Sequence, residues 1–399
     1  MSRKLRIGQA IAVMLLALLS AGPAAAALLE VPEDHETIAA ALGAAGYGDT
    51  VSIAPGTYYE HDLVWLPGVS ILGRTGSPGM VIIDAQTQGR VLGGENLVPE
   101  NELAHLTLRG GHEPGLYGSG LMAIGDPILH DLIIEDCIST TVIYGIGLYT
   151  DGGATITDCV LRNNRSTAAD TKGGGAWLDT WANRPIRVQN VEVYGNQAED
   201  GSGLFINGRS AYVDGLYCHD NLGVGLAAYH IDTDGEGPTI ENSLFVDNTG
   251  SAIYFAAGIV LRNCTIVGNG PQGSGWGALA CWSTWDHPHN PTIAQCIIAN
   301  NKGSGISWYE PSPYTIECND VYGNVFANYV NIPDLTGEDG NVSVDPEFCG
   351  SGVGNYGLQA DSPCAPGNND CGLLMGAQPV ACGDTAARAT SWSHVKSLY

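Results

Sequence analysis

A short phrase of alternating apolar and polar residues recurs along most of the chain, and each copy ends in asparagine. In the copy at residues 239–248 we expect Ile240, Leu244 and Val246 to point inward, because side chains alternate between the two faces of a strand. A second short element usually follows and begins with glycine or alanine, as in residues 145–151. Two or three such strands per repeat, joined by tight turns, make one coil of a solenoid. The pattern therefore predicts an all-β, single-stranded parallel β-helix of about nine coils, roughly 40 Å long at the usual strand spacing.

The closing asparagines return at intervals between 21 residues, from Asn248 to Asn269, and 32 residues, from Asn164 to Asn196. We expect each of them at a turn, where asparagine tolerates left-handed backbone geometry. Their stacked side-chain amides can then hydrogen-bond to one another along the axis of the solenoid. Sugar or metal binding is the alternative role. The predicted ladder consists of Asn164, Asn196, Asn221, Asn248, Asn269, Asn301 and Asn324.

The stretch before the repeats predicts a cap for the open end of the solenoid. Asp34 is expected to begin a short helix with apolar positions at Ile38 and Leu42, and Gly46 to end it. Residues 48–60 then predict a strand, a turn and a second strand. A cap of this kind protects an uncovered strand edge from aggregation.

Two stretches of the chain resemble a known group. The letters TIAAALGAAGYGDTVSIAPGTYYE at residues 37–60 are similar to the N-terminal coil of secreted bacterial right-handed parallel β-helix proteins of the pectin-lyase-like superfamily. The letters DPEFCGSGVGNYGLQADSPC at residues 345–364 resemble the terminal segment of many of them. The resemblance implies a right-handed helix with a short N-terminal capping helix. The catalytic phrases of pectin methylesterases and polygalacturonases are absent, so it implies a fold and no particular activity.

The N-terminus predicts export. Arg3, Lys4 and Arg6 precede an apolar run at residues 11–19, and small residues at 24–26 offer a cleavage site. The run is short of the roughly 20 residues that span a bilayer, and a membrane anchor is the alternative. We expect no membrane span in the mature chain and a secreted or cell-surface location. The expected segments are a signal peptide at 1–26, the cap helix and first coil at 27–60, coils at 61–348, a cysteine-rich closure at 349–382 and a tail at 383–399.

Cysteines fall into two groups. Cys159, Cys264 and Cys296 occupy one repeat position, where a small buried side chain is expected. The second group lies in a segment rich in glycine, proline and asparagine, where disulfides would replace a hydrophobic core. Its four members allow three pairings, which the sequence leaves open, and a zinc site is the alternative. This second group consists of Cys349, Cys364, Cys371 and Cys382.

The charge of the chain limits the classes of molecule that it can bind. The formal net charge is -26, which repels nucleic acid at long range. An anionic polysaccharide would need a mediating cation. We therefore expect a polysaccharide or glycan surface as the partner, no nucleic acid, and a monomeric chain.

Aligning the second strands on their leading glycine predicts two outward files of side chains. The first contains Tyr149, Trp177, Phe205 and Tyr254, and the second contains Asp151, Asp179, Asn207 and Tyr229. Trp282 and Tyr309 lie farther along. Aromatic rings in file can stack on the faces of sugars, but ordinary stacking between strands is the alternative.

Several candidates could supply chemistry. Asp151 and Asp179 on adjacent coils would lie about 5 Å apart, which suits acid and nucleophile roles in glycoside cleavage or a Ca²⁺ site. Two solvated turn residues are the alternative. Elimination from a uronate could use Arg184, Arg209, Lys172 or His230, and residues 286–289 hold two histidines that could meet one metal. A second possible Ca²⁺ site consists of Asp232, Asp234 and Glu236.

These observations favour a secreted or cell-surface protein that binds polysaccharide and is a candidate lyase or glycoside hydrolase. Its candidate catalytic residues are Asp151, Asp179, His230 and Arg209. Its candidate sugar-binding residues are Tyr149, Trp177, Phe205, Tyr229, Tyr254, Trp282 and Tyr309. The alternative is a non-catalytic adhesion scaffold, because fold alone does not determine activity.

Overall fold

The computed structural model describes residues 26–382, apart from 113–114, 142–143, 167, 181–183, 209, 230–236, 257, 283–289 and 310–312. The predicted signal peptide and tail lie almost wholly outside the described residues. Among the described residues no helix is long and apolar enough to cross a membrane.

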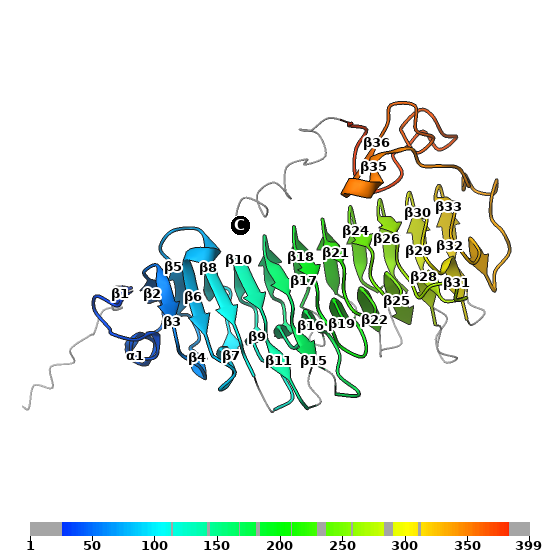
Figure 1. Cartoon of the computed structure of the whole chain (residues 1–399). Coiled ribbons are helices and arrows are strands. Elements are labelled where there is room, and N and C mark those ends of the chain that lie inside the picture. The colour runs from blue at the N-terminus through cyan, green and yellow to red at the C-terminus, as the bar shows by residue number, and fades with distance from the viewer. Residues whose placement is uncertain are drawn as a thin grey trace, which may run out of the picture.

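The chain winds into a right-handed parallel β-helix in which successive coils add strands to three parallel sheets (Figure 1). The first sheet contains β1 (Leu28–Val31), β2 (Thr50–Ile53), β5 (Ser70–Gly73), β8 (Glu102–Arg109), β10 (Ile128–Glu135), β13 (Thr155–Thr157), β17 (Ile186–Gln189), β20 (Ala211–Asp214), β23 (Thr239–Glu241), β26 (Val260–Arg262), β29 (Thr292–Ala294) and β32 (Thr315–Glu317).

The second sheet joins the first at β8 and β10, which are long enough to run through both. Its other strands are β3 (Gly56–Tyr58), β6 (Val81–Asp84), β14 (Val160–Arg162), β18 (Glu192–Tyr194), β21 (Tyr217–His219), β24 (Leu244–Val246), β27 (Thr265–Val267), β30 (Ile297–Ala299) and β33 (Asp320–Tyr322).

The third sheet contains β4 (Leu63–Trp65), β7 (Leu92–Leu97), β9 (Leu121–Gly125), β12 (Leu148–Gly152), β16 (Ala176–Asp179), β19 (Leu204–Asn207), β22 (Leu226–Tyr229), β25 (Ile253–Ala256), β28 (Gly277–Cys281), β31 (Ser304–Trp308) and β34 (Tyr329–Val330). Smaller elements are β11 (Ile138–Ser139), β15 (Arg165–Ser166) and the turns of 3₁₀ helix η1 (Pro78–Met80) and η2 (Ser351–Val353).

This third sheet has eleven strands, so the expected nine coils were too few. The coils before Asn164 lack the closing asparagine phrase on which the expectation rested. Eleven strands extend about 48 Å at a strand spacing of about 4.8 Å.

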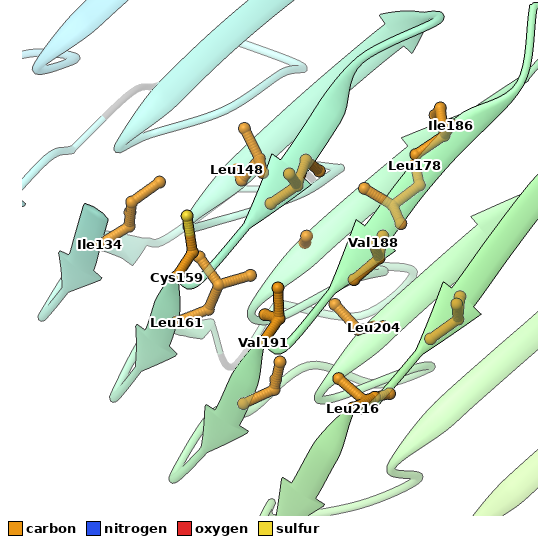
Figure 2. Close-up of a cluster of buried hydrophobic side chains, with 14 of the residues drawn as sticks. Ile134, Leu148, Cys159, Leu161, Leu178, Ile186, Val188, Val191, Leu204 and Leu216 are labelled. Atoms are coloured by element: carbon orange, nitrogen blue, oxygen red, sulfur yellow. The ribbon is translucent and has the colours of Figure 1, made fainter. Parts of the chain in front are cut away.

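Aliphatic side chains from all three sheets fill the interior in stacked layers. Figure 2 shows Leu161 of the second sheet, Leu148 and Leu178 of the third, and Val188 of the first among the side chains of this interior cluster. All four are almost fully buried. Each coil buries its own layer against the coils on both sides, as expected for a solenoid.

The expectation that Leu244 and Val246 point inward is wrong. Phe245 belongs to the interior cluster together with Ile240, whereas Leu244 and Val246 pack on the outside against Tyr356. A corner residue in the left-handed conformation, with φ 51° at position 242, separates β23 from β24. The alternation of faces therefore restarts after the corner.

Such a left-handed corner lies between the first and second sheets in coil after coil, and the strand registers stack these residues in one file. Their φ values lie between 47° and 67°. Asparagine, aspartate and glycine tolerate this conformation best, and most positions hold one of them. This corner file consists of His105, Asp131, Asp158, Asn190, Gly215, Asn242, Asn263, Gln295 and Cys318.

The closing asparagines form a buried ladder. Each side-chain Nδ2 donates to the Oδ1 of the next asparagine at 2.9–3.2 Å, from Asn164 through Asn324. None of them has a positive φ, so the left-handed geometry expected there is wrong. The residue before each one takes that conformation instead, as Asn163 and Asp220 do.

The N-terminal cap helix α1 spans Ile38–Ala44. Its N-cap is Thr37, whose Oγ1 accepts the N–H of Ala40 at 3.1 Å, so the expected cap at Asp34 is wrong. The carboxylate of Glu60 accepts the N–H groups of Ile38 and Ala39, both at 2.8 Å. Glu60 closes the GTYYE phrase, so this sequence joins the helix to the first coil.

The disulfides join Cys318 to Cys371 and Cys349 to Cys382. Pairing within the four C-terminal cysteines is therefore wrong for Cys364 and Cys371. Cys364 is a free, buried thiol. Cys371 pairs instead with Cys318, a member of the corner file. Cys159, like the other interior cysteines, is free and buried.

The segment after the last coil folds back along the outer face of the second sheet (Figure 1). It carries the antiparallel pair β35 (Phe348–Gly350) and β36 (Asn355–Leu358). Tyr356 covers Leu244 and Val246, and Leu358 packs near Ile297. This explains why the outward residues of β24, β27 and β30 are apolar apart from Thr265, whose Oγ1 accepts the N–H of Ala377 in that segment.

Candidate functional site

The third sheet carries two outward files of side chains in strict register. Tyr149, Trp177, Phe205, Ala227 and Tyr254 pair in succession from β12 to β25. The neighbouring file runs through Asp151, Asp179, Asn207 and Tyr229. Equivalent residues of successive coils therefore stack in the two files that the repeat alignment predicts. The side chains around each residue determine whether it can bind a ligand or take part in catalysis.

The N-terminal half of the first file is closed. Trp177 is 9% exposed and Phe205 is 2% exposed, and their rings stack with centroids 4.3 Å apart. Tyr117 packs on Tyr149 at 4.4 Å, and Tyr144 packs on Trp177 at 4.6 Å. Tyr149, Trp177 and Phe205 thus form a second apolar layer outside the sheet, with no ring face open to a sugar.

The C-terminal half of the same surface is open. Trp276 and Trp282 are 42% and 41% exposed, and both lie beside Tyr309, at 4.7 and 5.6 Å between ring centroids. Tyr229 and Tyr254 continue the row toward the closed half, 5.5 Å apart. Exposed rings in a row offer stacking surfaces at intervals along the solenoid. Sequence reasoning missed Trp276, which lies directly before β28 between Gly275 and Gly277.

A cleft of about 410 Å³ lies between these two halves. Tyr229, Tyr254 and Trp276 form its aromatic walls, and Asp200 supplies the acidic group. Val224, Gly250, Ser251 and Pro271 complete the lining. An apolar cleft with few polar groups is the usual form of a small-molecule or substrate site.

Asp200 has the environment of a proton-exchanging group. Burial raises its pKa above the ordinary value of 3.8, and the hydrogen bond with Tyr229 and the charge of Lys172 oppose the rise. The backbones of Lys172 and Asp200 form an isolated parallel β-bridge between adjacent coils. Lys172 Nζ lies 5.2 Å from the ring centroid of Phe205 and 5.5 Å from that of Tyr229. Sequence reasoning missed Asp200 because it lies outside the repeated strands, at an isolated bridge position without a motif.

Asp151 and Asp179 are direct partners in the register of β12 and β16, as expected. Asp179 is buried and accepts hydrogen bonds from Trp177 Nε1 at 3.4 Å and Asn207 Nδ2 at 3.5 Å. Burial raises the pKa of Asp151, and the charge of Arg184 opposes the rise. The pair lies beside the closed aromatic layer and outside the cleft lining, and its catalytic or Ca²⁺-binding role stays a prediction.

Other expected candidates lie outside the described residues: Arg209, His230, Asp232, Asp234, Glu236 and residues 286–289. Their proposed roles in catalysis and Ca²⁺ binding stay predictions.

Residues 127–284 and 186–344 match the family described as the right handed beta helix region, so the chain belongs to that family. No curated protein sequence matches the chain.

The titles of several solved structures with a similar fold describe proteins that act on polysaccharides. The A-module of the Azotobacter vinelandii mannuronan C-5 epimerase AlgE4 is 16% identical, with 72% of this chain and 91% of that chain covered and a TM-score of 0.45. The PL6 family alginate lyase AlyGC is 16% identical, with 81% and 54% covered and a TM-score of 0.38. A GH87 α-1,3-glucanase catalytic domain in complex with tetrasaccharides is 13% identical, with 82% and 69% covered and a TM-score of 0.45. At this level the likeness is one of fold alone.

Proposed function

We propose that the protein is an exported, carbohydrate-active protein that binds a polysaccharide along the open aromatic surface and cleaves it at Asp200. The observation that supports this most is the cleft in which Asp200 lies among Tyr229, Tyr254 and Trp276. Tyr309 and Trp282 extend the surface beyond the cleft, which suits a chain of sugars more than a single sugar. Two disulfides suit an oxidising compartment outside the cytoplasm.

Asp200 would act as a general acid. A carboxyl group with a raised pKa can hold a proton at mildly acidic pH and donate it to the oxygen of the departing sugar. Hydrolysis and elimination both need that proton, so the proposal covers both reactions. In elimination from a uronate, Lys172, beside Asp200, would stabilise the negative charge that develops on the sugar. Hydrolysis of a neutral glycan has an oxocarbenium-like transition state and would not use this charge. The net charge of -26 favours neutral glycans, because an anionic glycan meets repulsion over most of the surface.

The test is a panel of neutral glucans and anionic uronans, with and without Ca²⁺, in which reducing ends and unsaturated uronate products are followed separately. We expect Asp200→Asn to keep glycan binding and to lower turnover about 100-fold or more. Asp170→Asn is the matched control, because Asp170 is exposed and its left-handed backbone tolerates asparagine. The wild-type rate should fall as pH rises through the raised pKa of Asp200, since only the protonated acid is active.

Each outcome separates one part of the proposal from another. Retention of a glycan without any product would leave a binding protein and remove the catalytic role. No retention on any glycan would favour the adhesion scaffold. Full turnover by Asp200→Asn would show that another group donates the proton.

A further inference from the structure

Two histidines and an aspartate meet at the corner between the first and second sheets, far from the aromatic surface of the third. One ligand atom from each of His105, His130 and Asp131 lies within 4.8 Å of the others. His105 Nδ1 lies 3.6 Å and His130 Nδ1 lies 2.8 Å from Asp131 Oδ2. The rings of His105 and His130 meet edge to face, with centroids 5.1 Å apart.

His105 differs from most members of the corner file. Its members are mostly Asn, Asp or Gly, which the left-handed conformation favours, whereas position 105 holds a histidine with φ 60°. Two other members differ, Gln295 and Cys318, of which Cys318 forms a disulfide to the C-terminal segment. Histidine also tolerates the left-handed conformation, so the case for a site rests on the surroundings of His105 and not on its backbone.

His105 Nδ1 is buried and has no hydrogen-bond partner within the described residues. A buried polar atom without a partner costs about 1–3 kcal/mol, so it is rare unless something else binds it. The atom points toward the shared Asp131 carboxylate, which already meets His130. A cation between these three atoms would satisfy all of them.

A carboxylate behind His130 completes the arrangement. Glu102 Oε1 lies 2.7 Å from His130 Nε2 and accepts a hydrogen bond when that nitrogen is protonated. This fixes the ring and leaves Nδ1 as the atom facing Asp131. Metal-binding histidines usually carry such an outer carboxylate, which orients the ring and raises its basicity.

We propose that His105, His130 and Asp131 form a binding site for a divalent transition metal, with Zn²⁺ as the best fit. Imidazole and carboxylate together suit Zn²⁺, whereas Ca²⁺ prefers oxygen ligands alone. In a tetrahedral Zn²⁺ site with bonds of about 2.1 Å, ligand atoms lie roughly 3.4 Å apart, close to the 3.6 Å between His105 Nδ1 and Asp131 Oδ2. His130 Nδ1 and Asp131 Oδ2, now 2.8 Å apart in a hydrogen bond, must separate slightly when both bind the ion. Three protein ligands leave the fourth position for water or a small anion, and the side chains of both histidines are partly exposed.

The chain contains a matched control cluster. His219 Nδ1 lies 2.7 Å from Asp220 Oδ2, and its Nε2 lies 3.1 Å from Glu192 Oε1, as in the His130 arrangement. The cluster lacks a counterpart to His105, since no second histidine groups with it among the described residues. It therefore offers the same histidine and carboxylates without the second imidazole.

The experiment measures Zn²⁺ binding to tag-free, chelator-treated full-length protein by competition with a coloured chelator. We expect one tight site in the wild type. The asparagine of His105→Asn suits the left-handed backbone of the corner file. We expect His105→Asn and His130→Gln each to weaken Zn²⁺ binding about 100-fold. Glu102→Gln should weaken it about 10- to 100-fold. His219→Gln should leave the affinity unchanged.

Co²⁺ provides a second readout, because cobalt in a tetrahedral nitrogen and oxygen site absorbs visible light. The wild type should show this spectrum and His105→Asn should lose it, while circular dichroism confirms that the variant remains folded. A wild-type protein that binds no Zn²⁺ would overturn the proposal. Binding that is unaffected by both His105→Asn and His130→Gln would overturn it as well, and would point to histidines elsewhere in the chain.

Discussion

Replacing Asn221 by alanine is expected to lower the free energy of unfolding by roughly 3–9 kcal/mol. Asn221 Oδ1 accepts both the backbone N–H and the side-chain Nδ2 of Asn196, each at 3.1 Å. Its own Nδ2 donates to the backbone oxygen of Val193 at 3.0 Å and to Asn248 Oδ1 at 2.9 Å. Truncation leaves two donors and a carbonyl of neighbouring coils without partners.

Burial is what makes this loss large. Asn196, Asn221 and Asn248 are all fully buried, so water has no route to the freed groups. Each buried group left unpaired costs about 1–3 kcal/mol, and three are affected. The hydrogen bonds also cross between coils, where a solenoid gains its stability from nearest-neighbour contacts.

The measurement is urea unfolding of the wild type and the variant, with the slope compared to check that both unfold over the same surface. Asn328→Ala is the matched control at the exposed end of the ladder. Asn328 accepts from Asn324 in the same way, at 2.9 Å, but is only half-buried, so water can replace it. We expect a loss of about 1 kcal/mol there. Equal losses at the two positions would refute the argument from burial.

The repeat explains why the sequence predicts so much of the fold. Each coil repeats the same local conditions, so equivalent residues such as Asn196 and Asn221 stack without any long-range information. The same holds for the files through Trp177 and Asp179, which the alternation of strand faces places outward.

Features that depend on several segments at once could not be predicted in this way. The inward position of Phe245 follows from a left-handed corner that resets the alternation of faces. The disulfide from Cys318 to Cys371 requires the C-terminal segment to fold back over the second sheet. Only the packing of Tyr117 and Tyr144 shows which half of the aromatic file is closed.

The candidate sites show the same division. The sequence pattern identified residues on strands, whereas Asp200 lies at an isolated bridge and His105 at a corner, two positions that the repeated phrases do not mark. His105 and His130 are neighbours because their coils are adjacent in register, although the chain separates them by a whole coil. An alignment of the coils by position, searched for residues that differ from the rest of their file, would have identified His105 and Cys318.

The pH dependence of stability is expected to be dominated in one window by Asp320. This residue of β33 is fully buried, and its carboxyl accepts the N–H of Val344 at 3.1 Å and the thiol hydrogen of Cys364 at 3.3 Å. Burial raises its pKa from 3.8 to about 7, while both hydrogen bonds oppose the rise. Because Cys364 and Val344 follow the last coil, the ionisation of Asp320 is linked to the docking of the C-terminal segment.

The sign follows from proton binding. Between pH 4 and pH 7 the folded chain holds a proton on Asp320 that the unfolded chain has released. The contribution of Asp320 to stability is therefore fully present below about pH 4 and is lost as pH rises to about 7. One pKa unit corresponds to about 1.4 kcal/mol, so the total change is on the order of 4 kcal/mol.

Asp320→Asn isolates this contribution, because asparagine has a similar shape and is neutral at every pH. We expect the stability of the variant relative to the wild type to rise by about 4 kcal/mol between pH 4 and pH 8 and to level off above that. The measurement is the free energy of unfolding in urea at a series of pH values, in which carboxylates common to both proteins cancel. Parallel pH profiles for the two proteins would show that Asp320 ionises normally and that water reaches it beneath the C-terminal segment.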